Sequence, residues 1–253
     1  MTDKKFNELV DIMYRLRKEC SWDREQTHDS IKAATLEEAY EAVEAIDNKN
    51  FDELKAELGD LLLHVVFHSV IAEENNIFNI EDVIDTISQK LIRRHPHVFG
   101  NVKVKNNEDI LRNWETIKLD EGRKSVLDGV PRSLPELHKA FRLQEKASKV
   151  GFDWTDKSEV WKKVEEEIGE LKEIINTEKS EEIEKEVGDV LFSFVNYCRF
   201  LKINPEDALR RSNEKFTKRF QYIEQRLEES GKSVSSSSLK EMDELWEESK
   251  SFI

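Results

Sequence analysis

Acidic residues recur in one fixed pattern at two places in the chain. Each place reads Glu-Glu-x-x-Glu and then Glu-x-x-Asp. The candidate positions are Glu38, Glu41, Glu57 and Asp60 in the first copy and Glu167, Glu170, Glu186 and Asp189 in the second, with Glu37 and Glu166 beginning the motifs. Residues three apart share one face of an α-helix, so each motif pairs two carboxylates. A short turn between two such helices would let the pairs face each other.

Four converging carboxylates repel one another unless a cation lies between them. Hard oxygen ligands from two helices suit Mg²⁺, which keeps several waters for substrate phosphates, and Mn²⁺ accepts the same donors. The pattern therefore predicts a Mg²⁺ site in each copy, with Mn²⁺ as a substitute.

An alternative is that these residues are ordinary solvated surface, as most glutamates are in a chain with 37% charged residues. The Glu-x-x-Asp pairs argue against it, because they lie at the start of the largely apolar stretches 57–67 and 186–195. We expect these two helices to be buried, and buried carboxylates without partners are costly.

A glycine stands inside each of these helices, Gly59 in the first copy and Gly188 in the second. A glycine within a helix costs about 1 kcal/mol relative to alanine. Its presence in both copies indicates the close approach of a neighbouring helix, or ordinary helix packing.

Cations follow each acidic pattern. Lys90 with Arg94, and Lys215 with Arg219, are spaced four apart and share a helix face. Such groups can neutralise the outer phosphates of a triphosphate, with arginine binding bidentately, or they can pair with neighbouring glutamates.

The pattern belongs to a longer internal repeat. Residues 31–68 match residues 160–197 at a constant offset of 129 without a gap, and matching resumes at an offset of 125. Two copies of this length indicate a tandem domain duplication. We predict an N-terminal domain over 1–121, a linker over 122–136 that contains two of the four prolines, and a C-terminal domain over 137–253 that ends in a short helix.

The predicted fold class is all-α, as two tandem helical bundles. Only 8 glycines and 4 prolines are available for turns, while good helix formers recur throughout. We predict helices over 3–19, 29–48, 51–75, 80–95, 108–121, 134–149, 157–176, 180–201, 205–229 and 239–251.

The net charge of −14 argues against general binding of nucleic acid or anionic membranes. No apolar stretch approaches the roughly 18 residues that span a bilayer, and the N-terminus lacks a signal-peptide core. The two cysteines lie in no metal-binding cluster. We expect a cytoplasmic protein with reduced thiols.

With these motifs in view, the chain resembles the all-α nucleoside triphosphate pyrophosphatases, which include MazG proteins and dimeric dUTPases. The resemblance to the two-domain MazG form covers nearly the whole chain. It rests on the acidic pairs and on the stretches 20–28, 90–99, 130–135 and 150–154. Ser21 departs from the family's usual proline in this stretch, which bears on loop rigidity and not on the chemistry.

The resemblance implies hydrolysis of NTPs and dNTPs to the monophosphate and pyrophosphate, in a homodimer that serves nucleotide-pool housecleaning. A metal-activated water would attack the α-phosphorus. The eight acidic positions named first are then the metal ligands, and Glu37 and Glu166 serve a second metal or the outer shell. Glu170, Glu186, Lys215 and Arg219 are implied as catalytic residues, and Lys215, Arg219, Trp246, Trp154, Lys90 and Arg94 as substrate-binding residues. The resemblance also implies that the C-terminal half carries the main activity.

Aromatic residues near predicted helix ends, which are Trp22, Trp154, His97 and Phe99, can stack on a nucleobase or fill a core. Three other functions compete with the pyrophosphatase prediction. His28-Asp29 can begin an HD-type metal phosphohydrolase site, Glu25-x-x-His28 can belong to a di-iron bundle, and the acidic stripes can be the exposed faces of a helical scaffold.

Overall fold

The computed structural model describes residues 2–121, 125–176 and 179–252. Within these residues every regular element is a helix and none is a strand, which confirms the predicted all-α class. The chain divides into two compact units, 1–110 and 111–253. The predicted division at residue 121 and the linker 122–136 stay predictions, and residues 122–124 of that linker lie outside the described residues.

The first unit contains α1 (Thr2–Glu19), α2 (Ser21–Glu25), α3 (His28–Asp47), α4 (Phe51–Glu74), α5 (Ile80–Arg94) and α6 (Pro96–Phe99). Helix α7 (Asn107–Asp120) crosses the division. The second unit continues with α8 (Glu136–Ser148), α9 (Lys157–Ile174), α10 (Ser180–Phe200), α11 (Pro205–Glu229), the 3₁₀ turn η1 (Val234–Ser236) and α12 (Leu239–Ser249). All ten predicted helices are present, with ends within two residues of the prediction. The elements missed, α2, α6 and η1, are too short to show a helical period.

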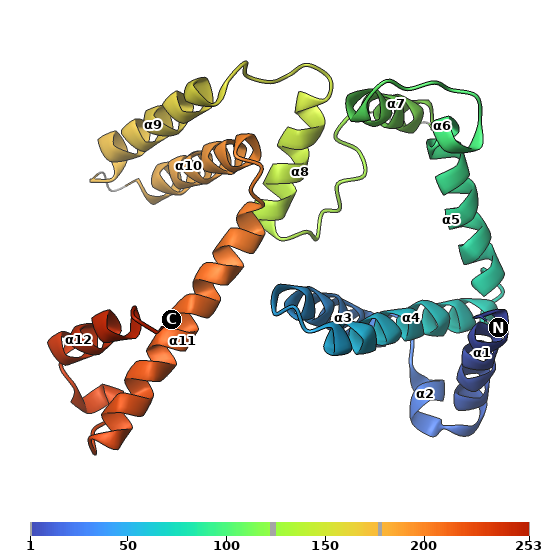
Figure 1. Ribbon diagram of the computed structural model, residues 1–253, viewed down its shortest axis with the longest axis horizontal. Helices are drawn as coiled ribbons and strands as arrows, with labels where there is room; N and C mark the ends of the chain where they lie inside the picture. Colours follow the sequence, from blue (N-terminus) through green and yellow to red (C-terminus); the bar gives the residue numbers. More distant parts are fainter. Residues whose placement is uncertain (1, 122–124, 177–178, 253) are drawn as a thin grey trace. The chain divides into compact units, whose positions relative to one another are not determined.

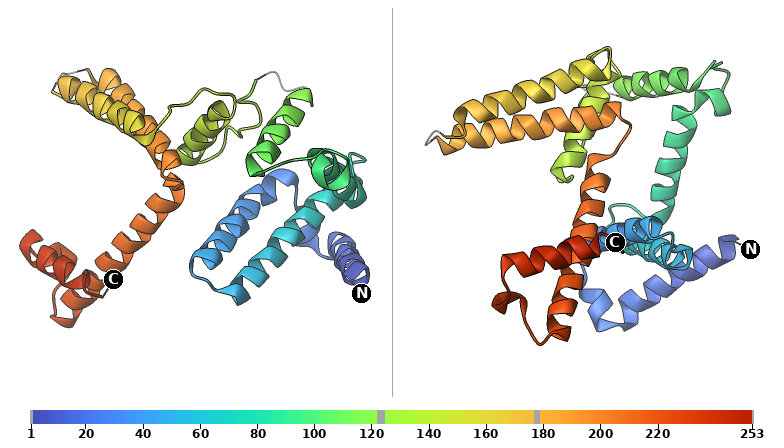
Figure 2. Two further views of the ribbon diagram at one scale, coloured as in Figure 1. Left: turned by 45° about the horizontal axis from the view of Figure 1, so that its top comes forward. Right: turned by 60° about the vertical axis from the view of Figure 1, so that its left-hand side comes forward.

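Two antiparallel hairpins organise the units, α3 with α4 in the first and α9 with α10 in the second (Figures 1 and 2). Local signals start and end these helices. Thr27 caps α3 by accepting from the backbone N–H of Ser30, and Asn50 caps α4 by accepting from the N–H of Glu53. Lys49 turns the chain between them in the left-handed region, at φ 54°.

The core of the first unit lies under α1, on the C-terminal half of α4. Its buried members are Val10, Met13, Ile31, Val66, Phe67, Val70, Ile71 and Ile80. Arg17 is also buried and forms an ion pair with Glu74 of α4. Its guanidinium donates to the backbone oxygens of Asp23 and Gln26 as well, the latter at 3.0 Å. Arg17 therefore fixes α1 to α4 and to the segment around α2.

The expectation that α4 and α10 are buried is wrong for one face of each helix. Leu58 is 54% exposed and Leu191 is 52% exposed. A methyl group added at Gly59 or Gly188 would meet no described atom within 4 Å, so no neighbouring helix of the described chain approaches these glycines. Among the described residues of each unit, the apolar face that carries Leu58 or Leu191 is therefore exposed.

Within the part of the chain that the structure describes, no helix is long and apolar enough to cross a membrane.

Candidate functional site

The first copy brings three of its four predicted ligands together. Glu38 and Glu41 of α3 and Glu57 of α4 each offer a carboxylate oxygen, and these oxygens lie within 4.8 Å of one another. Desolvation raises the pKa of Glu57, and a hydrogen bond shared with Glu38 raises it further. The charge of Glu57 in turn raises the pKa of Glu41. The closeness of these carboxylates therefore makes ionisation less favourable for Glu41 and Glu57.

The second copy brings together Glu167 of α9 with Glu186 and Asp189 of α10, again within 4.8 Å. Glu167 is buried, at 8% exposure. The Nζ of Lys163 lies 2.8 Å from Glu167 Oε1 and 2.7 Å from Glu166 Oε1. Hydrogen bonds to these two carboxylates raise the pKa of Lys163. An ammonium group thus already lies beside this acidic group.

Asp60 and Glu170 lie outside the two groups of three. Glu170 is nevertheless close enough to respond to them, because desolvation and then the charges of Glu167 and Glu186 raise its pKa. The assignment of all eight residues as ligands stays a prediction.

The donor sets fit a hard divalent cation. Carboxylate oxygens from two facing helices are what Mg²⁺ and Mn²⁺ take in proteins. In the second copy, Glu186 Oε2 is buried and has no hydrogen-bond partner among the described residues. A buried oxygen of this kind is costly unless a cation or donor reaches it. This orphaned oxygen and the ammonium beside Glu167 both show that the group attracts positive charge.

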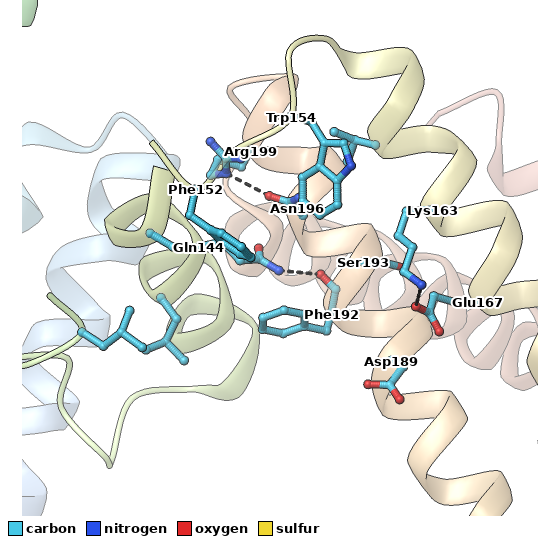
Figure 3. Close-up of a pocket in the computed structure, with 14 residues that line it drawn as sticks. Gln144, Phe152, Trp154, Lys163, Glu167, Asp189, Phe192, Ser193, Asn196 and Arg199 are labelled. Carbon is cyan, nitrogen blue, oxygen red and sulfur yellow. Dashed lines mark hydrogen bonds and ion pairs between the residues drawn. The ribbon is translucent and has the colours of Figure 1, made fainter. Parts of the chain in front are cut away.

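A cavity of about 340 Å³ opens beside the second acidic group, between α8, α9 and α10 (Figure 3). Glu167 and Asp189 lie at one end of it, the rings of Phe152 and Trp154 line the other, and Phe192, one helical turn after Asp189, lies between them. Such a volume is typical of small-ligand sites. Of the aromatic residues singled out in the sequence, Trp154 lines this cavity. Trp22 and Phe99 are instead mostly exposed, at 64% and 61%, so they do not fill a core.

The sequence patterns did not single out three further residues of this cavity, Gln144, Lys163 and Asn196. One signal was available for Asn196, because the repeat aligns this polar residue with Phe67 of the first copy inside an otherwise apolar run. Lys163 could have been found from its spacing, since it precedes Glu167 by four residues on the same helix.

The predicted phosphate-binding cations do not line this cavity. Lys90 and Arg94 lie on α5, and Lys215 and Arg219 lie on α11. Helix α5 follows the C-terminal end of α4, and α11 follows the C-terminal end of α10; in each hairpin this end is opposite the turn (Figure 1). The guanidinium carbon of Arg219 lies 5.5 Å from the ring centroid of Trp246 on α12. Arg219 Nε is buried without a hydrogen-bond partner among the described residues. The substrate-binding roles of these residues stay predictions.

The competing metal sites find no support in the geometry. His28 Nδ1 lies 2.8 Å from His68 Nδ1, whereas Asp29 pairs with Lys32 at 3.0 Å. Among the described residues, the groups of three that can hold a metal are the two acidic ones, and neither includes Glu25 or His28.

Comparison with known proteins agrees with the duplicated architecture. The MazG nucleotide pyrophosphohydrolase domain matches residues 26–99 and residues 156–223, which confirms two tandem copies. A Thermotoga maritima protein named "Nucleoside triphosphate pyrophosphohydrolase/pyrophosphatase MazG" is 48% identical over 250 residues, covering 97% of this chain and 95% of the relative. An Escherichia coli "Nucleoside triphosphate pyrophosphohydrolase" is 42% identical over 254 residues, covering 96% and 95%. The Bacillus subtilis "Uncharacterized protein YabN" is 47% identical over 235 residues, which make up 91% of this chain and 48% of that protein.

Proposed function

This chain belongs to the MazG nucleotide pyrophosphohydrolase family, and on that premise we propose that it hydrolyses NTPs and dNTPs to the monophosphate and pyrophosphate with the help of Mg²⁺. The observation that carries the proposal is in the second unit. There a group of three carboxylates, one with an orphaned oxygen, adjoins a cavity with an apolar end. Charged phosphates and a flat base need these two environments side by side.

Glu167, Glu186 and Asp189, with Glu170 nearby, would hold Mg²⁺ or Mn²⁺, which supplies a water of lowered pKa and neutralises phosphate charge. The attack is directed at the α-phosphorus, so pyrophosphate leaves. Lys163, which already contacts Glu166 and Glu167, adds positive charge at the same end of the cavity. Glu166 belongs to the outer shell in this arrangement, and Glu37 has the same place in the first copy.

We propose a homodimer as the working form. The uncovered apolar faces of the two hairpins include Leu58, Leu62, Leu191 and Phe194, all more than 40% exposed. Contiguous apolar surface of this kind is typical of an interface. Lys215, Arg219 and Trp246 lie away from the acidic group of their own hairpin, and a second chain could bring such residues to it. Nucleotides are the proposed small-molecule partners, with no nucleic acid, and the proposed role is cytoplasmic nucleotide-pool housecleaning.

The decisive test is the identity of the products. Purified protein is incubated with each NTP and dNTP and Mg²⁺, and the products are separated by ion-exchange chromatography. We expect monophosphate and pyrophosphate, and complete loss of turnover when EDTA removes the metal. Diphosphate with inorganic phosphate, or turnover that survives EDTA, would contradict the proposal.

Mg²⁺ should also raise the melting temperature, because it would offset the desolvation that raises the pKa values of Glu57 and Glu170 and the charge of Glu57 that raises the pKa of Glu41. A ligand at about 100 times its Kd stabilises the folded state by roughly 2.7 kcal/mol. Calorimetry with Mg²⁺ and with EDTA measures the difference. The double variant Glu57→Gln/Glu186→Gln is the control, and it should melt at the same temperature in both buffers. A wild-type protein that is indifferent to Mg²⁺ would count against both metal sites.

A further inference from the structure

The cavity of the second unit has an acidic end and an apolar end, which correspond to the phosphates and the base of a nucleotide. Its acidic end contains the proposed metal ligands, its opposite end is lined by Phe152 and Trp154, and the ring of Phe192 lies between the two ends. These three rings are large and still solvent-accessible, with Phe152 at 78% exposure. Aromatic side chains left open around a cavity provide faces on which a flat base can stack.

Gln144 of α8 adds a polar group to this apolar end. Its Nε2 donates to the backbone oxygen of Phe192 at 2.8 Å, which fixes the orientation of the carboxamide (Figure 3). The reverse orientation would place two acceptor oxygens against each other. The Oε1 atom is therefore the free end, and it is buried without a hydrogen-bond partner among the described residues. A buried acceptor in this state needs an N–H or O–H donor.

The polar lining is specific to the second copy. Asn196, which is 4% exposed, occupies the position that is Phe67 in the core of the first unit, and Arg199 lines the cavity beside it. Arg199 donates from Nε to Asn196 Oδ1 at 2.9 Å, and its Nη1 lies 2.9 Å from Asp153 Oδ2. The second copy therefore has an ordered polar group beside the cavity where the first copy has a core phenylalanine.

We propose that the apolar end is a nucleobase pocket and that Gln144 Oε1 accepts a hydrogen bond from an exocyclic amino group of the base. The inference rests on the proposed hydrolysis of nucleotides and names what the site recognises in them. An amino group projects beyond the ring and can reach an acceptor held at the pocket wall, as the amino groups of adenine and cytosine do. Gln144 is thus a specificity-determining residue that acts on the base, away from the reacting phosphorus.

The test compares ATP with purine riboside triphosphate, which lacks only the 6-amino group. For the wild type, kcat/KM for ATP should exceed that for the analogue by about tenfold, since the analogue leaves the buried acceptor unpaired. In Gln144→Met the ratio should fall to near one. The matched control is Arg15→Met, at the position 129 residues earlier on α1, which should leave the wild-type ratio unchanged.

The ratio on one preparation cancels the fraction of active enzyme, so partial unfolding of a variant does not distort it. A wild-type ratio near one overturns the inference even if Gln144→Met fails to fold. A wild-type ratio near ten that persists in folded Gln144→Met overturns it as well. If the wild type releases no pyrophosphate from any nucleotide, the proposed function itself has failed, which is a different result from turnover without discrimination.

Discussion

Replacing Glu186 with glutamine should lower the rate of pyrophosphate release by at least about 100-fold. Glu186 contributes a carboxylate to the second acidic group, and its Oε2 is buried without a hydrogen-bond partner among the described residues. Glutamine has nearly the same shape, but it is neutral and one of its two ligand oxygens becomes an amide nitrogen. The loss therefore falls on cation binding and charge stabilisation, while the fold is kept. Initial rates at saturating nucleotide and Mg²⁺ measure it.

Glu57→Gln is the matched control for this substitution, because the repeat aligns Glu57 with Glu186. It should have a much smaller effect, since the nucleotide-sized cavity described here adjoins the second acidic group. If the rate of Glu186→Gln lies within twofold of the wild-type rate, the second acidic group takes no part in the reaction. A larger loss from Glu57→Gln would move the main activity to the N-terminal half.

The largest expected effect on stability is that of Phe67→Ala, at about 3–5 kcal/mol. Phe67 is 4% exposed in the core under α1, and the guanidinium carbon of Arg17 lies 5.8 Å from its ring centroid. Truncation removes apolar contacts, leaves a cavity and removes the ring beside which the guanidinium of the buried Arg17 lies. Urea unfolding followed by far-UV circular dichroism measures the change.

Asn196→Ala provides the comparison at the aligned position of the second copy. It removes one hydrogen-bond acceptor from Arg199 and should cost less stability, about 1–3 kcal/mol. Its main effect should be on kcat/KM, because Asn196 lines the cavity. If Phe67→Ala costs under about 1 kcal/mol, the first core is not packed as described.

Local features made much of the fold predictable. Helix ends follow capping residues such as Thr27 and Asn50, which act through neighbouring backbone groups and can be read in sequence. The convergence of Glu38, Glu41 and Glu57 also follows from local rules, because one short turn between two helices suffices to bring them together.

The nucleobase pocket could not be predicted in this way. Gln144 reaches the backbone of Phe192 across 48 positions, on a helix that has no regular spacing to the acidic motifs. The apolar runs of α4 and α10 were equally ambiguous. Hydrophobicity shows that a face needs cover, but it does not say whether the same chain provides that cover, and Leu58 and Leu191 are in fact open.

Because of the lysine beside the second acidic group, the two copies differ in how the negative charge of their carboxylates is neutralised. The first copy has Ala34 where the second has Lys163, so its carboxylates lack the ammonium group that the second copy places beside Glu166 and Glu167. The second copy has its own counter-ion, covalently attached and in contact with Glu166 and Glu167. A divalent cation held by Glu167, Glu186 and Asp189 would compete with this ammonium group for the carboxylate of Glu167. Lys163 would then be available to pair with another anion, such as the phosphates of an incoming nucleotide.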